Sequence, residues 1–183
     1  MTDFSKALDT MITDADWARM AKEADMPASD LKEKVMTELA AVFEGTADAG
    51  RVGNDVGNLE FTLGEAKESG ECHTQEFEIS LYKIIGLSGE LTLCGTSMDD
   101  FSAELKFCLV VAGAKVWCAS YSFDPHNLSV CFSPDVGAAK AQICFHLRPR
   151  GNSLCLAISG EACIWTIWWQ CERFDETLFC IPI

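Results

Sequence analysis

The sequence predicts an α+β protein that is mainly β, with an N-terminal segment of three short helices packed on a C-terminal antiparallel β-sandwich or barrel. Apolar residues recur at helical spacing before residue 45, and apolar and polar residues alternate from Leu59 onward. Tight connections such as Ala112-Gly113-Ala114 separate the alternating runs, which indicates antiparallel hairpins. The chain has 183 residues, enough for one substantial core and a small helical part.

Three helices are expected at the N-terminal end. The first carries apolar residues at helical spacing from Phe4 to Ile12. The second begins at Thr13, where the sequence resembles a capping box, and ends at Pro27. The third ends at Gly45, a residue type that suits the position after a helix.

The chain is expected to divide into three parts. Residues 1–45 form the helical segment, residues 46–57 form a glycine-rich connection, and residues 58–183 form the β-sandwich or barrel domain. In the last part the apolar pattern has a period of two, which is typical of half-buried strands. The expected strands lie near residues 58–64, 76–85, 89–95, 102–112, 114–123, 127–133, 139–148, 153–159, 162–172 and 177–182.

The alternation gives each strand an inner and an outer face. Large apolar residues such as Phe107, Ile143 and Leu156 share one phase, which we expect to form the core. Polar residues occupy the other phase together with cysteines. The cysteines placed on this second face are Cys94, Cys108, Cys131, Cys144 and Cys155.

The ten cysteines are expected to be reduced. The chain start shows no secretory leader pattern, and the cysteines lack the loop framework of small secreted domains. We therefore expect a soluble, cytoplasmic protein, with a disulfide-bonded state as the alternative. Because exposed thiols are reactive, a cover over the second face is expected. The helical segment is the first candidate for this cover, and an interface in a homo-oligomer is the other.

One group of residues has the composition of a thiolate metal site. Cys144 and His146 share a face of one strand, and Cys155 follows on the next strand, after the turn from Pro149 to Asn152. We expect Cys155 to lie opposite His146 or, one register over, opposite Cys144. Two thiols and an imidazole suit Zn²⁺ or copper, and the second register also permits a disulfide. Packing of the cysteines as small apolar groups, with no cofactor bound, is the simpler interpretation.

A tryptophan-rich stretch runs from Cys163 to Cys171 and is apolar in both phases. Such a run is typical of a central strand that is buried on both sides. The functional alternative is a ligand-binding surface built on tryptophans. The candidate residues are Trp165, Trp168 and Trp169, with Trp117 nearby.

The charge distribution argues against two classes of partner. The net charge is −14; residues 1–100 carry 21 acidic and 8 basic residues, whereas residues 101–183 carry 7 and 6. An acidic surface repels phosphate backbones and anionic membranes. Nucleic acid is therefore not an expected partner, membrane binding is not favoured, and basic or neutral partners are.

The chain carries no recognisable catalytic motif. It has no Gly-x-Ser-x-Gly, Gly-x-Gly-x-x-Gly, P-loop or His-Glu-x-x-His run, and it has three histidines. An enzyme is therefore not favoured. A thiol nucleophile at Cys144 or Cys155 with His146 as its base is the enzymatic alternative.

The sequence thus predicts a non-enzymatic binding protein that uses its Trp-rich, nearly neutral C-terminal half to bind an apolar ligand or a protein partner. Two other hypotheses stay open. One is a membrane-active, pore-forming-like β-sandwich whose amphipathic helix around residues 4–12 detaches. The other is a thiolate metal-binding or redox protein.

Overall fold

The computed structural model describes residues 9–49, 59–82, 84–137, 139–165 and 169–183. Residues 9–11 are helical, and two longer helices follow, α2 (Asp14–Ala24) and α3 (Ala28–Ala49). The strands of the described part are β1 (Glu60–Ser69), β2 (Cys72–Tyr82), β3 (Ile85–Ser97), β4 (Asp100–Val111), β5 (Ala114–Phe123), β6 (Ser129–Phe132), β7 (Ala139–Arg150), β8 (Ser153–Trp165) and β9 (Trp169–Pro182).

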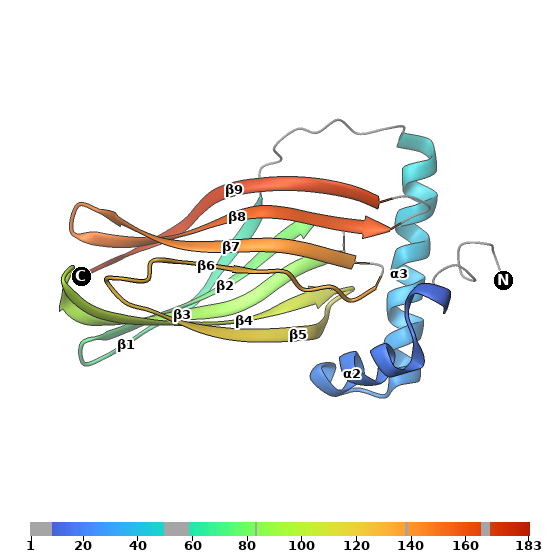
Figure 1. Ribbon diagram of the computed structural model, residues 1–183, viewed down its shortest axis with the longest axis horizontal. Helices are drawn as coiled ribbons and strands as arrows, with labels where there is room; N and C mark the ends of the chain where they lie inside the picture. The colour runs from blue at the N-terminus through green and yellow to red at the C-terminus, as the bar shows by residue number, and fades with distance from the viewer. Residues whose placement is uncertain (1–8, 50–58, 83, 138, 166–168) are drawn as a thin grey trace.

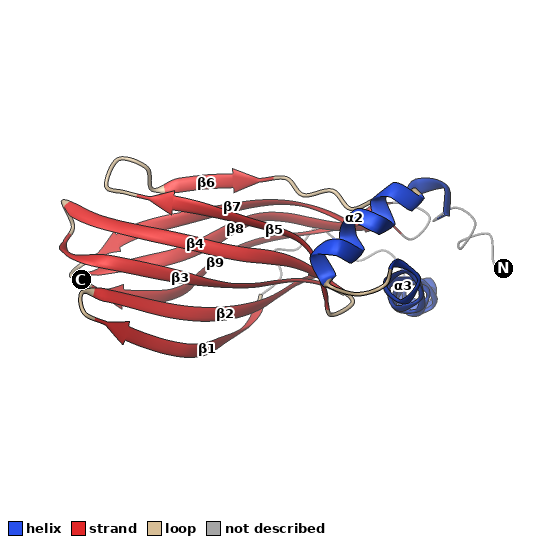
Figure 2. Cartoon of the chain, turned by 90° about the horizontal axis from the view of Figure 1, so that it is seen from below, coloured by secondary structure: helices blue, strands red, loops and turns tan. Residues whose placement is uncertain are grey.

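The strands form two antiparallel sheets that lie face to face (Figures 1 and 2). The first sheet has the order β1-β2-β3-β4-β5 and the second has the order β6-β7-β8-β9. In both sheets each strand pairs with the next strand along the chain, so every pairing is a local hairpin. The predicted fold class is confirmed. Of the two predicted architectures, sandwich and barrel, the structure has a sandwich-like arrangement of two open sheets.

The core lies between the inner faces of the two sheets. Phe107, Ile143 and Leu156 are all buried, as the alternation predicts. Phe77 on β2 reaches Phe179 on β9, with 6.1 Å between the ring centroids, so aromatic rings join the sheets near one edge. This apolar layer holds the sheets together through the hydrophobic effect.

The helices cover one end of the sandwich and leave both outer faces uncovered (Figures 1 and 2). Their apolar stripes meet the ends of β4, β5 and β7. The side chains around this contact are Ile12, Met20, Val35, Leu39, Val111, Val116, Val136 and Ala139. The expectation that the helices cover the cysteine-bearing face is therefore wrong, because their stripes fill the open end of the core instead.

The start of α2 follows the predicted capping box. Thr13 Oγ1 accepts a hydrogen bond from the Asp16 backbone N–H at 3.2 Å, and Asp16 Oδ2 accepts one from the Thr13 backbone N–H at 3.0 Å. These bonds stabilise the ionised carboxylate, so the pKa of Asp16 lies below its usual value. The predicted end of α3 is wrong, because the helix continues through Gly45 to Ala49.

The expected break between the strands near residues 153–159 and 162–172 is also wrong, because β8 continues through Ser159-Gly160-Glu161. Gly160 has φ of 144° and pairs with Ile143 on β7 and with Phe174 on β9. A Cβ atom there would lie 1.9 Å from the Gln142 carbonyl oxygen. The glycine allows close approach of β7 rather than a chain reversal, which is a second common role of glycine in strands.

The structure also changes the interpretation of the tryptophan-rich stretch. It is not one central strand, because Trp165 ends β8 and Trp169 begins β9, and these two residues lie opposite each other. The stretch is therefore a hairpin end, and Trp168 lies outside the described residues.

Gly160→Ala should destabilise the fold strongly, because the new Cβ would strike the β7 backbone. We expect the free energy of unfolding to fall by about 3 kcal/mol or more, measured by urea denaturation. Gly151→Ala is the matched control: its φ is 61° but no heavy atom lies within 4 Å of the added carbon. Its cost should be about 1 kcal/mol, and equal losses in the two variants would contradict the close approach.

Candidate functional site

All ten cysteines lie in the described residues, and they form five disulfides. Each disulfide joins two residues that lie directly opposite each other on neighbouring strands of one sheet. The expectation of reduced thiols is therefore wrong. The pairs are Cys72–Cys94, Cys108–Cys118, Cys131–Cys144, Cys155–Cys180 and Cys163–Cys171.

The pairing explains how cysteines occupy an outer face without a cover. Directly opposed residues bring their Cβ atoms within about 5 Å, close enough for their sulfurs to bond. A sulfur in a disulfide is no longer a reactive thiol, so exposure of Cys118 and Cys131 carries no such hazard. Because these sulfurs are bonded to each other, they need no cover.

Two register shifts bring distant cysteines opposite each other. Between β8 and β9 the register shifts after Leu156, and both Leu178 and Phe179 are buried as a result. Between β4 and β5 the register shifts after Leu109, and Val116 on β5 is buried as a result. One extra residue in one strand of a pair is a β-bulge, which sequence alternation alone does not reveal.

The structure does not assemble the predicted metal site. Cys144 is bonded to Cys131 and Cys155 to Cys180, so neither sulfur is a thiolate. Cys155 also lies opposite Arg148, rather than opposite His146 or Cys144. The register differs because Arg150 pairs with Ser153, so the connection is two residues shorter than the one expected from Pro149 to Asn152.

His146 lies on the outer face of the second sheet between two serines. Its Nδ1 is 2.8 Å from Ser129 Oγ, and its Nε2 is 3.0 Å from Ser159 Oγ. Burial and the nearby Arg148 guanidinium lower the pKa of His146, which Asp175 partly opposes. The neutral ring can donate to one hydroxyl and accept from the other, so it stabilises three strands rather than activating a thiol.

The tryptophan candidates fall in two separate settings. Trp117 belongs to an aromatic cluster between the sheets, with its ring centroid 5.7 Å from that of Phe107 and 5.9 Å from that of Phe132. Trp169 is 37% exposed, and Lys140 Nζ lies 4.1 Å from its ring centroid. Trp165 and Trp169 therefore mark a surface at the β8–β9 hairpin, while Trp117 contributes to packing.

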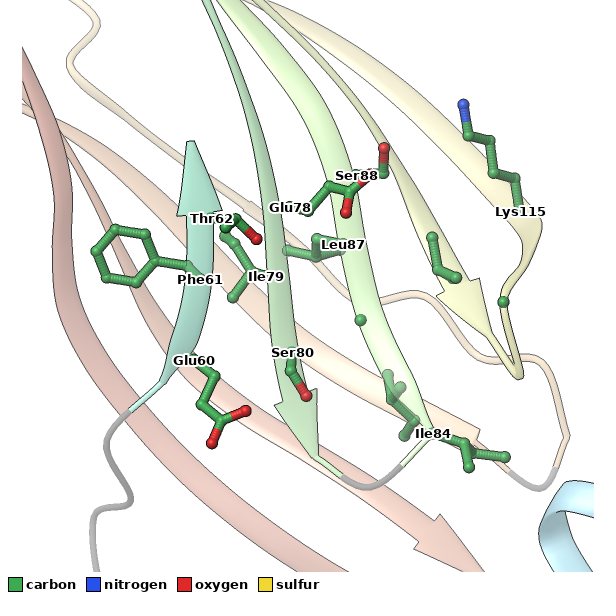
Figure 3. A pocket seen from close by; sticks show the side chains of 14 residues that line it. Glu60, Phe61, Thr62, Glu78, Ile79, Ser80, Ile84, Leu87, Ser88 and Lys115 are labelled. Atoms are coloured by element: carbon green, nitrogen blue, oxygen red, sulfur yellow. The ribbon is translucent and has the colours of Figure 1, made fainter. Parts of the chain in front are cut away.

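Two hollows lie on the outer face of the five-stranded sheet. They adjoin, have volumes of about 680 and 630 Å³, and share Thr62, Glu78, Ser88 and Lys115 among their lining residues. We call them together the outer groove. Figure 3 shows that these side chains come from four strands, β1, β2, β3 and β5, and border one hollow.

Small residues make the floor of the outer groove. Gly86 lines one hollow and Gly89 lines the other, and a Cβ atom on Gly86 would be 2.7 Å from the Ile79 carbonyl oxygen. Ser80 and Ser88 flank this glycine with short side chains on the neighbouring positions. These small residues leave room above the sheet, and longer glutamate and lysine side chains also line the outer groove.

The outer groove is acidic. Glu76 and Glu90 lie directly opposite each other on β2 and β3, and Glu78 lies two residues after Glu76 on β2. Like charges in opposed positions repel each other, and Lys106, which lies opposite Glu90 on β4, offsets this repulsion while it also pairs with Glu104. The charged lining residues are Glu60, Glu76, Glu78, Glu90, Lys106 and Lys115.

Sequence reasoning did not select these glutamates. They share the second face with the cysteines, and their common phase on consecutive strands was a signal that could have pointed to them. The signal became specific only with the register, because the register decides which glutamates oppose each other.

No protein-family model, no curated protein and no solved structure matches the chain. Within the described residues, no helix has the length and apolar character needed to cross a membrane.

Stability should fall on the acid side of neutrality because of His146. An unfolded histidine titrates near pH 6.5, and the folded pKa is lower, so the unfolded chain binds more protons between these two values. The stabilisation is full above pH 6.5 and is lost as the pH falls through the folded pKa. Urea unfolding of the wild type and of His146→Gln should show this part of the pH dependence only in the wild type.

An NMR titration of the His146 ring tests the cause directly. A ring pKa at or above 6.5 in the folded protein would contradict the effect of burial and Arg148.

Proposed function

We propose that the protein is a non-enzymatic binding protein and that its outer groove takes an extended, basic segment of a protein partner. The observation that carries the proposal is the opposed glutamate pair Glu76 and Glu90 beside Glu78 in the outer groove. Lysine or arginine side chains of a partner would relieve the repulsion among these carboxylates.

The shape of the outer groove supports an extended occupant. The two hollows adjoin along β2 and β3, and Thr62 and Ser88 lie opposite Glu78 on the strands to either side of it. The hydroxyl groups of Thr62 and Ser88 can hydrogen-bond a peptide backbone, while glutamates select its side chains. The lining also includes apolar side chains such as Phe61, Ile84 and Val110, which can contact the aliphatic part of a lysine or arginine side chain.

Long-range electrostatics support the same class of partner. The acidic excess of the chain lies in residues 1–100, and most lining residues of the outer groove, including all of its glutamates, come from this half. A negative groove on a negative half attracts a basic segment and speeds its association at low salt.

The β8–β9 hairpin is a second candidate surface, as the sequence predicts. Trp169 is one of two large apolar residues that are exposed in the described part, the other being Leu63. An exposed indole with a lysine above it suits an apolar or aromatic contact of a partner. The Trp169→Ala variant removes this contact and leaves the outer groove unchanged, so it distinguishes binding at the two surfaces.

The two other hypotheses have weaker support. Release of the first helix from the sandwich would expose Ile12, which is buried among α2, α3 and the strand ends; residues 1–8 lie outside the described part. Metal binding at Cys144, His146 and Cys155 lacks free thiolates.

The five disulfides favour an oxidising compartment. The cytoplasmic location expected from the sequence depended on reduced thiols, so it loses its chemical support. We propose an oxidising location, which fractionation of cells that make the protein can test.

Removal of the groove glutamates should weaken binding of a basic peptide. The probe is a fluorescently labelled peptide of alternating lysine and serine, measured by anisotropy at low salt. Glu76→Gln/Glu78→Gln/Glu90→Gln should raise the Kd about tenfold or more, because three charge contacts are lost. Trp169→Ala should leave the Kd unchanged.

The matched control is Glu23→Gln/Glu33→Gln/Glu38→Gln, which removes the same charge from exposed positions of the helices. Near-ultraviolet circular dichroism checks that both triple variants are folded. Equal weakening in the two triple variants would mean that net charge, rather than the outer groove, binds the peptide, and loss in Trp169→Ala alone would move the site to the hairpin.

A further inference from the structure

A carboxylate and a disulfide meet on the outer face of β8 and β9. Glu161 Oε1 lies 3.5 Å from Cys163 Sγ, and Cys163 is bonded to Cys171 directly across the strand pair. The carboxylate oxygen and the two sulfurs lie within 4.8 Å of one another. Among the described residues, this is the one group of three or more histidine, cysteine or acidic side chains with such spacing.

In the oxidised state Glu161 lies directly opposite Arg173 and pairs with it, while its other carboxylate oxygen lies against the Cys163 sulfur. A disulfide sulfur carries no proton, so Glu161 gains no hydrogen bond from Cys163. Arg173 holds the other carboxylate oxygen, with 3.4 Å between Arg173 Nε and Glu161 Oε2. The glutamate is therefore fixed in place beside two sulfur atoms.

We propose that Cys163, Cys171 and Glu161 form a site for a thiophilic divalent cation such as Zn²⁺ when the Cys163–Cys171 disulfide is reduced. Two thiolates and one carboxylate are a donor set that suits zinc, with a fourth position open to water. This site uses none of the residues that the sequence suggested for metal binding, and it is independent of the outer groove.

The chemical step is a thiol–disulfide exchange followed by metal binding. A dithiol reductant supplies two electrons and two protons, so the Cys163–Cys171 bond breaks to give two thiols while the reductant becomes a cyclic disulfide. The cation then displaces the two thiol protons to solvent and binds the two thiolates and the Glu161 carboxylate.

The backbone already places the ligands for such a site. Zn–S distances are about 2.3 Å, so two sulfurs on a tetrahedral ion lie about 3.8 Å apart. Cys163 and Cys171 stay opposed after reduction because β8 is also paired with β7 and the Cys155–Cys180 disulfide joins the same two strands. Cys171 is exposed, so its side chain has room to turn away from Cys163.

Nearby positive charges balance the site. Two thiolates and a carboxylate carry three negative charges, and a divalent cation leaves one. Lys140 lies opposite Cys163 on β7, and Arg173 is in contact with Glu161. These cations offset the remaining charge without supplying a competing ligand.

Metal titration of the reduced protein tests the proposal. The full chain is treated with dithiothreitol, desalted without oxygen, and titrated with Co²⁺ and then with Zn²⁺. Alkylation and mass spectrometry identify the free thiols, and near-ultraviolet circular dichroism checks the fold. We expect about one Co²⁺ per chain with sulfur-to-cobalt charge-transfer absorption, displaced by Zn²⁺.

Three variants decide the ligands. Cys163→Ser/Cys171→Ser should lose the charge-transfer absorption, and Glu161→Gln should weaken Co²⁺ binding by about tenfold or more. Cys72→Ser/Cys94→Ser is the matched control, because it removes a disulfide between β2 and β3 in the other sheet and should leave Co²⁺ binding intact. The proposal fails if the folded protein keeps Cys163–Cys171 oxidised, binds no metal after reduction, or binds it equally without these two cysteines.

Discussion

Covalent bonds between outward-facing side chains hold neighbouring strands together in this protein, and the rest of the structure depends on them. Every disulfide joins two strands of the same sheet, and the two sheets are joined by apolar packing. The bridged residues are 8 to 25 positions apart in the sequence. Loops of this size are worth about 2.5–3.5 kcal/mol each through the entropy of the unfolded chain, and nested pairs contribute less than their sum.

Because disulfides join the strands within each sheet and apolar packing joins the two sheets, the outer faces are free for binding. Because the disulfides make a cover unnecessary, the helices can fill the end of the sandwich, where Ile12 and Leu39 meet Val111. The face of the five-stranded sheet then remains open, with Gly86 at the floor of the outer groove and Glu76 opposite Glu90. Stable hairpins also tolerate the repulsion between these glutamates, which a weaker sheet would relieve by moving apart.

The inner face of the sandwich was predictable, and the outer face was predictable only in part. Phe107 and Ile143 are buried as expected, because a period of two in polarity reports directly on burial. The pairing of Cys155 with Cys180 required the extra residue at Leu178, and the continuity of β8 required Gly160 to approach Gln142. Both depend on contacts between distant residues. The outer groove was missed for the same reason, since Glu76 and Glu90 become neighbours only through the register.

Disulfide mapping tests the central claim most directly. Digestion of the non-reduced protein and mass spectrometry of the linked peptides should recover Cys72–Cys94, Cys108–Cys118, Cys131–Cys144, Cys155–Cys180 and Cys163–Cys171, with no free thiol in the native protein. A peptide that links a cysteine of β2–β5 to one of β6–β9, or several free thiols in protein purified without reductant, would contradict it.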